Sequence, residues 1–114
     1  WRSPQNDNLW QGVNGINNPC PSGYRIPTDT ELDAERLSWS TQNSAGAIAS
    51  PLKLPVAGYR FNSNGSLSDV GTLVSYWSST VSGADARGLS FYSSYAVMGD
   101  YFRAYGSSVR CIKD

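Results

Sequence analysis

Apolar residues occur in this chain in short runs separated by stretches rich in Gly, Ser and Asn, which predicts several short strands. The run at residues 73–79, with its Tyr and Trp, suits a pleated, half-buried surface and is predicted to be an interior strand. At a period of two, Trp77 and Ser79 face one side of this strand, while Tyr76 and Ser78 face the other. We expect Trp77 to anchor the core, and the two serines to satisfy backbone groups where the strand ends.

A helix is predicted from Thr28 to about residue 40. Thr28 and Glu31 have the spacing of a capping box, in which each side chain bonds the backbone N–H of the other residue. Acidic side chains at Asp29, Glu31 and Asp33 lie near the positive end of the helix dipole, which accounts for them without a metal or a catalytic role. The residues expected to form the apolar face of this helix are Leu32, Leu37 and either Ala34 or Trp39.

The other expected elements are short. Prolines at residues 19–27 force turns and are expected to present Tyr24 and Ile26 inward. Asn62 to Gly65 predicts a hairpin with a primed turn, because Asn-Gly readily adopts positive φ. The remaining expectations are an irregular segment at residues 1–18 with Trp10 packed on the core, a helical turn at 45–49, an edge strand at 52–60, a return strand at 67–70, a strand at 88–91 and a closing strand at 108–112.

Length and charge narrow the class of protein. The chain has 114 residues, with nine acidic and nine basic side chains that are scattered along it. We therefore expect a single domain over residues 1–114, excised from a longer protein because it opens on Trp1 without a signal-like segment. The charge pattern does not indicate binding to nucleic acid or to a membrane surface. No apolar run approaches the roughly 20 residues of a membrane span.

Histidine is absent, which removes the usual general base and the commonest metal ligand. The only cysteines are Cys20 and Cys111, and they could be a disulfide, two buried thiols, or a nucleophile and a bystander. The abundance of Gly, Ser, Asn and Tyr is typical of a loop-rich extracellular domain, in which such a pair most often bridges. We expect a disulfide, and no metal or other cofactor.

Three passages together resemble a known family. They are Asn-Pro-Cys-Pro-Ser-Gly-Tyr-Arg-Ile-Pro-Thr at residues 18–28, Tyr-Trp-Ser-Ser-Thr at 76–80, and Gly-Ser-Ser-Val-Arg-Cys-Ile at 106–112. Over residues 17–114 the chain resembles the Fibrobacter succinogenes major paralogous domain family, related to C-type-lectin-like folds of the formylglycine-generating-enzyme type. The resemblance implies an α+β fold with a small twisted antiparallel sheet, one or two helices and extensive ordered loops. It implies no catalytic residues, since the active-site cysteine segment of those enzymes is not found here.

The same ending resembles the variable domains of diversity-generating retroelements. In those domains the segment between the Trp-Ser-Ser motif and the closing Val-Arg strand carries the randomised ligand contacts, and residues 81–105 have a matching Tyr, Ser, Asp, Gly and Ala content. Independently, Tyr offers rigid amphipathic contact area and Ser, Gly and Asp offer adaptable hydrogen bonds, a mixture typical of antibody-like binding surfaces. Phe91, alternating with Leu89, is expected in the core, and Phe102 is an alternative core residue. The predicted ligand-binding residues are Asp85, Tyr92, Ser94, Tyr95, Asp100, Tyr101, Arg103 and Tyr105.

These patterns favour a non-enzymatic ligand-binding domain, an adhesin or receptor-recognition module. Its expected place is the cell surface or exterior, on a bacterial or phage protein such as a pilus tip, an outer-membrane lipoprotein or a phage particle, with an extracellular protein or glycan as ligand. The alternative is a carbohydrate-binding module: a flat tyrosine-rich face favours a protein, and a groove with parallel rings favours a glycan. No calcium site of the C-type-lectin kind is expected, because no Glu-Pro-Asn-like or Trp-Asn-Asp-like run occurs. A glycosidase would need two facing carboxylates, for which the candidates are Asp69, Asp85 and Asp100; a spacer domain is the remaining class.

Overall fold

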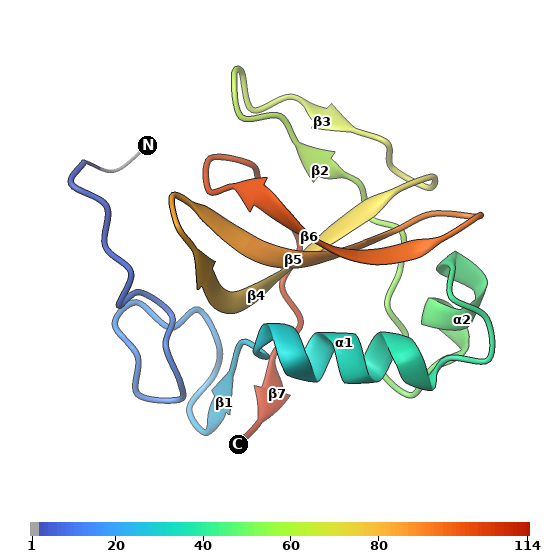
Figure 1. The fold of residues 1–114 in the computed structure, drawn as a ribbon, viewed down its shortest axis with the longest axis horizontal. Helices are drawn as coiled ribbons and strands as arrows, with labels where there is room; N and C mark the ends of the chain where they lie inside the picture. Colours follow the sequence, from blue (N-terminus) through green and yellow to red (C-terminus); the bar gives the residue numbers. More distant parts are fainter. Residues whose placement is uncertain (1–2) are drawn as a thin grey trace.

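The structure is a computed structural model that describes residues 3–114. In chain order the elements are β1 (Tyr24–Arg25), α1 (Asp29–Ser38), α2 (Ser44–Ala49), β2 (Tyr59–Arg60), β3 (Leu67–Ser68), β4 (Val74–Ser82), β5 (Asp85–Phe91), β6 (Ala96–Phe102) and β7 (Ile112–Lys113). Antiparallel pairing joins β1 to β7, β2 to β3, and the three strands β4-β5-β6 into what we call the main sheet. In Figure 1, α1 lies below this sheet and the β2–β3 hairpin above it. The prediction of a small α+β fold with few helices and antiparallel sheets is confirmed.

Strand β4 begins and ends later than predicted and is buried on both of its faces. Residues 74–79 are all buried, and Trp77 is only 6% exposed, which confirms its burial. Its side chain, however, lies on the face opposite Tyr76 and is not part of the core cluster, which corrects its role as core anchor. The pairing with β5 shifts between Trp77 and Val81, so that β4 contains a bulge. Ser78 donates its hydroxyl to the Arg87 carbonyl at 2.8 Å and accepts the Thr80 N–H at 3.2 Å, as expected of a serine near an irregular point of a strand.

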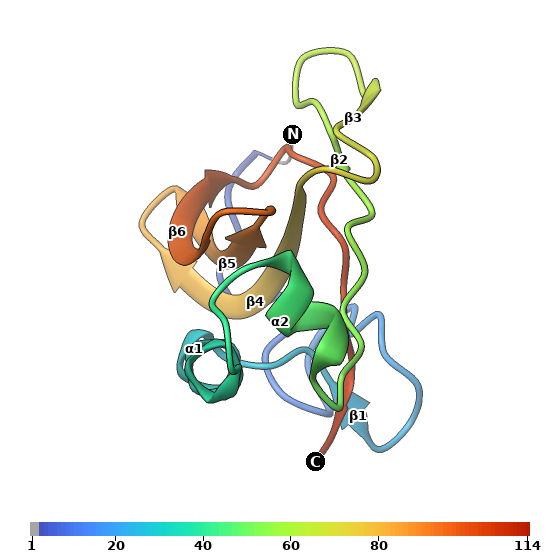
Figure 2. The ribbon, with the colours of Figure 1, turned by 90° about the vertical axis from the view of Figure 1, so that its right-hand side faces the viewer.

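The hydrophobic core lies between one face of the main sheet and the two helices. Phe91 is at its centre: its ring meets Trp39 edge-on at 5.5 Å and stacks on Tyr76 at 5.9 Å. Burial raises the pKa of Tyr76 to about 12, and its hydroxyl donates to the Pro55 carbonyl. Figure 2 shows both helices on the same side of the strands. The buried members of this core are Leu32, Trp39, Ala47, Leu54, Val74, Tyr76, Leu89, Phe91 and Ala96.

Helix α1 has the predicted capping box, since Thr28 accepts the Glu31 N–H and Glu31 accepts the Thr28 N–H. Leu37, however, is 60% exposed, which corrects its assignment to the core. Leu37 follows the buried Leu32 by five residues, about 140° around a helix, and so points elsewhere. Trp39 takes the place in the core because the chain leaves the helix there in an extended conformation.

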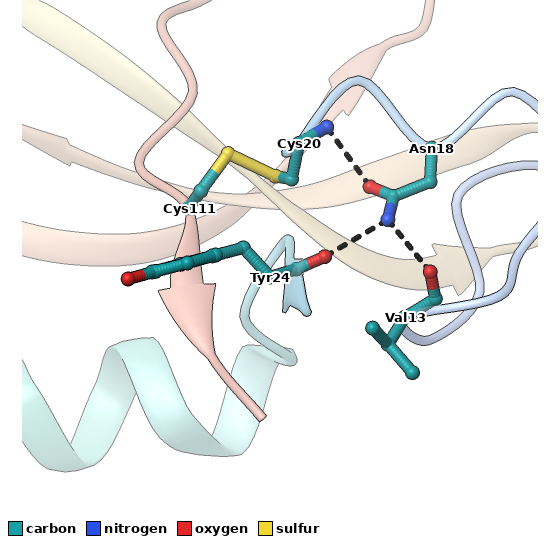
Figure 3. The surroundings of a disulfide bond; sticks show 5 residues. All are labelled: Val13, Asn18, Cys20, Tyr24 and Cys111. Carbon is teal, nitrogen blue, oxygen red and sulfur yellow. Dashed lines mark hydrogen bonds between the residues drawn. A yellow bond between two sulfur atoms is a disulfide. The ribbon is translucent and has the colours of Figure 1, made fainter. Parts of the chain in front are cut away.

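The disulfide between Cys20 and Cys111 joins residues 91 positions apart in sequence, with 5.7 Å between their Cα atoms. Figure 3 shows Asn18 beside it, accepting the Cys20 N–H and donating to the carbonyls of Val13 and Tyr24. These bonds fix the turn that delivers the cysteine. The side chain of Tyr24 is 39% exposed, so the expectation that it faces inward is wrong. Its strand pairs only with β7, which leaves its outer side without a covering layer.

Several predicted boundaries are corrected. Residues 81–105 contain two long strands, β5 and β6, where only residues 88–91 were expected to be extended. In the expected edge strand at 52–60 only the last three residues pair, with Gly58 in a single bridge to Val74. The closing strand is reduced to β7, while Ser108 forms a separate bridge with Tyr76. The β2–β3 hairpin forms, but its turn is not primed, because Gly65 (φ 71°) has positive φ and Asn64 does not. Within residues 3–114 no helix is long and apolar enough to cross a bilayer.

Candidate functional site

The face of the main sheet that points away from α1 carries serines and glycines together with two large rings, those of Trp77 and Tyr101, and we call it the open face. Its cross-strand neighbours follow from the register of the three strands and the alternation of side chains. They are Ser75, Ser90 and Val97, then Trp77, Gly88 and Gly99, then Val81, Ala86 and Tyr101. The two glycines in the middle row leave a shallow trough across the sheet.

The ring of Tyr101 fills this trough. A Cβ atom built on Gly99 would lie 2.8 Å from the Tyr101 hydroxyl, and one on Gly88 would lie 3.3 Å from its ring. Only glycine therefore lets the ring approach the two strands so closely. The edge of Tyr101 also contacts Trp77, with 6.5 Å between ring centroids. Tyr101 is thus held in place by the sheet, half-buried, with one side left available.

Tyr101 forms one wall of a groove of about 230 Å³ that runs over the open face. Two hydroxyl groups lie in its floor, those of Ser75 and Ser90, with their oxygens 2.6 Å apart. Tyr59 reaches the groove from β2, and Tyr105 from the segment after β6. We call it the tyrosine groove, and its lining residues are Tyr59, Leu73, Ser75, Ser90, Tyr95, Tyr101, Tyr105 and Ser107.

The tyrosine groove is lined by no charged side chain. The pKa of Tyr59 is raised, mainly by burial and secondly by the neighbouring carboxylate of Asp69. Its phenol therefore stays neutral well above physiological pH. The groove therefore presents phenol and serine hydroxyls, which both donate and accept, together with aromatic surface. Such a lining suits an uncharged, polar ligand group better than an ion.

An aromatic cluster adjoins the groove at the β2 end. The Tyr105 ring stacks on Phe102 with 6.0 Å between centroids, and meets Tyr59 and Phe61 at 5.8 Å and 6.0 Å. Phe102 is 58% exposed, which corrects the alternative that placed it in the core, and Phe61 is 39% exposed. The β2–β3 hairpin and the end of β6 thus extend the groove with accessible ring surface.

Three of the predicted ligand-binding tyrosines come together in this groove, namely Tyr95, Tyr101 and Tyr105. Tyr92 lies beside them, because its ring packs edge-on against Tyr95 at 4.1 Å. Ser94 is exposed in the turn that joins β5 to β6, next to Tyr95. These five residues occupy one connected part of the surface, four of them on the β5–β6 hairpin and Tyr105 in the segment after it.

The three predicted charged residues lie outside the tyrosine groove. Asp100 pairs at 3.3 Å with Arg87, which also pairs at 3.0 Å with Asp29 on the helix side of the sheet. Arg103 pairs with Asp7 at 2.8 Å and donates to the carbonyls of Gly83 and Asp85, so it fastens the N-terminal segment to the β4–β5 turn. Asp85 itself borders a different hollow, near Phe102.

Sequence reasoning missed part of the groove. Tyr59 was assigned only to a strand, and Ser75, Ser90 and Ser107 were not singled out. A signal for one of them was present: Ser90 sits between Leu89 and Phe91, which were expected in the core, so it belongs to the face away from the core. Ser75 was not recognised, because it shares the parity of Trp77, which was expected to face the core. No local signal places Tyr59 or Ser107 there, because both arrive from segments distant in sequence.

The surroundings of the groove offer hydroxyls and aromatic faces, and residues 3–114 hold no group of three His, Cys, Asp or Glu side chains placed to share a metal ion. The chain matches no family model, no curated protein and no solved structure. The walls of the groove are therefore the guide to what it binds.

Proposed function

We propose that this chain is a non-enzymatic binding domain that recognises an uncharged, polar surface of an extracellular partner through the tyrosine groove. The observation that carries the proposal is the convergence of four tyrosines on one open hollow, from β2, the β5–β6 turn, β6 and the segment after it. Buried core positions are explained by packing, whereas accessible tyrosines gathered from distant segments are explained by contact with a partner.

The construction of the groove favours binding with little loss of conformational entropy. Tyr101 is already held over Gly88 and Gly99, and Tyr92 braces Tyr95, so these rings are ordered before a ligand arrives. Rigid aromatic side chains with a polar tip give large contact area at low entropic cost. A protein partner fits this arrangement best, since the Tyr59 and Tyr105 rings stand at 73° to one another rather than parallel.

We also propose that the fold is C-type-lectin-like and belongs with the Fibrobacter succinogenes major paralogous domains. The order of the three resembling passages supports this, as does their meeting in space: Cys20 bonds Cys111, and Tyr76 bridges Ser108. A disulfide is compatible with an oxidising, extracytoplasmic location. A surface or secreted parent protein follows as part of the proposal.

We further propose that residues 81–105 are diversified by a retroelement. If these residues vary, variation should follow exposure: Tyr95 and Ser94 should change freely, while the fully buried Leu89 and Phe91 should stay apolar. Sequencing near-identical copies from related genomes tests this directly. Equal variation at buried and exposed positions, or none in the segment, would contradict it.

A carbohydrate-binding module is the second candidate, favoured by the uncharged hydroxyl lining of the groove. Sugar rings stack on aromatic faces, and the nearby Phe102–Tyr105 pair is nearly parallel, at 7°. Catalysis has less support, since none of the three candidate carboxylates lines the groove. Asp100 is paired with Arg87, Asp69 accepts the Ser68 hydroxyl, and Asp85 borders another hollow.

The test is a binding survey with a matched set of variants. Labelled wild-type domain is applied to arrays of extracellular protein ectodomains and of neutral glycans, beside Tyr95→Ala and Tyr24→Ala. Both tyrosines are exposed, at 42% and 39%, but Tyr24 lies on β1, near the end of the molecule opposite the β2–β3 hairpin (Figure 1). We expect a protein ligand whose affinity falls by about 2 kcal/mol in Tyr95→Ala and is unchanged in Tyr24→Ala.

Melting temperatures of the variants control for unfolding. Binding confined to glycans, and lost in Tyr95→Ala, would establish the carbohydrate-binding alternative. Ligands that bind both variants as they bind wild type would place recognition elsewhere and overturn the groove as the site.

A further inference from the structure

A second hollow lies on the open face, at the other end of the main sheet. It encloses about 310 Å³ between the sheet and the N-terminal segment, and is separate from the tyrosine groove, with which it shares no lining residue. Its apolar walls come from Leu9 and Trp10 on one side and from Trp77, Val81 and Ala86 on the other. We call it the tryptophan hollow. An apolar hollow half this size accommodates benzene in another protein, so this one has room for a substituted aromatic ring.

Among the residues of the hollow whose side-chain N–H groups bond no other residue within 3–114, only Trp77 is buried. Trp77 makes no hydrogen bond through its indole N–H within residues 3–114, unlike Trp39, whose N–H donates to Glu35 at 3.0 Å. In the same part of the chain no side-chain nitrogen or oxygen is both fully enclosed and unpartnered. The Trp77 N–H must therefore touch solvent, and the tryptophan hollow is the space that its side chain lines. An indole N–H that is nearly buried normally finds an acceptor.

The charges at the rim are already neutralised or absent. Arg103 pairs with Asp7 at 2.8 Å and bonds two carbonyls, and no acidic side chain lines the hollow. The hydroxyl of Thr80 accepts the Asp29 N–H, and that of Ser78 donates to the Arg87 carbonyl. Neither an anion nor a cation finds an available counter-charge among these residues, so the hollow suits a neutral molecule.

Trp10 is held in position as a wall. Its φ of 65° is unusual for an aromatic residue, and it is imposed by a short loop that closes when the Trp10 N–H donates to the Ile16 carbonyl at 2.9 Å. The Gln11 side chain then donates to the Ser79 carbonyl at 2.5 Å, which fastens this loop to the bulge of β4. The wall formed by this loop is thus hydrogen-bonded to the sheet on the other side of the hollow.

We propose that the tryptophan hollow binds a small uncharged ring compound that carries one hydrogen-bond acceptor, with the ring between Trp10 and Val81 and the acceptor on the Trp77 indole N–H. This site differs from the tyrosine groove both in position and in ligand class. It takes a free small molecule, whereas the groove takes part of a larger partner.

Two probes of nearly equal shape test the proposal: acetophenone, which has a carbonyl acceptor, and ethylbenzene, which has none. Each is titrated into nitrogen-15-labelled wild-type domain, and the indole N–H resonances are followed by NMR after assignment with single Trp→Phe variants. We expect saturable shifts of the Trp77 and Trp10 signals, no shift of Trp39, and an affinity for acetophenone about five- to tenfold above that for ethylbenzene, the worth of one ordinary hydrogen bond.

Variants separate the hydrogen bond from the cavity. Trp77→Phe keeps an aromatic wall but removes the donor, so acetophenone should bind it no better than ethylbenzene, as measured by ligand-observed NMR. Ala86→Phe places a ring in the hollow and should abolish binding of both probes, while Tyr95→Ala, in the tyrosine groove, should change neither affinity. If Ala86→Phe does not fold, the Trp77→Phe comparison still decides.

Three results would overturn the proposal. Shifts that spread over all four indoles without saturating would mean that no site exists. Equal affinities of the two probes for wild type would remove the role of the Trp77 N–H and with it the ligand class. Binding that persists unchanged in Trp77→Phe, with acetophenone still preferred, would place the acceptor elsewhere.

Discussion

The two faces of the main sheet are built from the same three strands but in opposite ways. On the core face, Val74, Tyr76, Leu89 and Phe91 are at most 4% exposed and lie under the helices. On the open face the alternate positions include serines and glycines beside Trp77 and Tyr101, and the cover consists of loop segments and tyrosine rings. One face is filled by matching shapes, and the other retains two hollows.

This difference separates stability from recognition. The apolar area that drives folding is concentrated on the core face, where a lost side chain leaves a cavity. The open face contributes hydroxyls and ring surface that the fold itself uses only in part. A sheet with such a division accepts changes on one face at little cost in folding, and four substitutions, from the largest expected effect to the smallest, test how complete the division is.

Phe91→Ala should be the most damaging of the four. Phe91 is fully buried and touches the rings of both Trp39 and Tyr76, so its removal should lower the free energy of unfolding by about 3–5 kcal/mol. Urea denaturation followed by circular dichroism measures the change, with the exposed Tyr95→Ala as the control, expected within about 1 kcal/mol of wild type. Similar losses in the two variants would show that the faces are not divided.

Trp77→Ala should cost somewhat less, about 3 kcal/mol, the low end for a large aromatic side chain. Trp77 is buried like Phe91, but one side of its indole borders the tryptophan hollow, so fewer packing contacts are lost. The same denaturation experiment measures it. A loss larger than that of Phe91→Ala would make the open face the main source of stability.

Acid should weaken the attachment of α1, which covers the core face. The Arg25 guanidinium, together with the Thr28 bonds, lowers the pKa of Glu31 from 4.5 to about 2. Because the folded-state pKa is depressed, the stabilisation is present above about pH 4.5 and is lost as the pH falls toward 2. The Glu31 side chain is 40% exposed, so solvent screening reduces the effect to the order of 1 kcal/mol. The stability of wild type and of Glu31→Gln, measured from pH 6 to pH 2, should therefore converge at the acid end; a constant difference would exclude this ion pair as the cause.

Gly99→Ala should change stability least, by under about 1 kcal/mol, yet alter the tyrosine groove. The added methyl group meets the flexible end of the Tyr101 side chain, 2.8 Å from its hydroxyl, so the ring moves rather than the strand. The α-proton resonances of Gly88, under the same ring, report this movement by losing their ring-current shift in NMR. Unchanged Gly88 resonances would mean that the ring does not lie in the trough.

The sequence predicted local features well. The capping box of α1, the short helix at residues 44–49 and the burial of Trp77, Leu89 and Phe91 all follow from signals within a few residues. The disulfide was expected from composition and is present. Each of these features can be recognised from residues close in sequence, from the alternation of side chains along a strand, or from the presence of only two cysteines.

Features set by tertiary contact were missed or misplaced. Strand β6 was not predicted, because Gly99 lowers its strand propensity and pairs with another glycine, Gly88 of β5. It forms because every residue of β6 has a pairing partner in β5. Arg103 was predicted to bind ligand because of its residue type, but it forms an ion pair with Asp7, almost a hundred residues earlier in the chain. The groove itself joins Tyr59 to Tyr105, a meeting that no local pattern encodes.

The disulfide has a mechanical consequence when the two ends of the chain are pulled apart. Tension applied to the two ends passes from Cys20 directly to Cys111, so the intervening residues, with the main sheet and the tyrosine groove, bear no load. The tryptophan hollow differs, because Leu9 and Trp10 in its wall precede Cys20. At about 3.5 Å per residue, full stretching lengthens the oxidised chain to roughly 80 Å, against roughly 400 Å once the bond is reduced. The contacts that would break under force join residues outside the loop to residues inside it, among them the β1–β7 pairing of Lys113 with Tyr24, and the bonds of Asp7 and Gln11 to Arg103 and Ser79. A ligand held in the tyrosine groove would thus remain bound to an undeformed surface while the two ends are pulled.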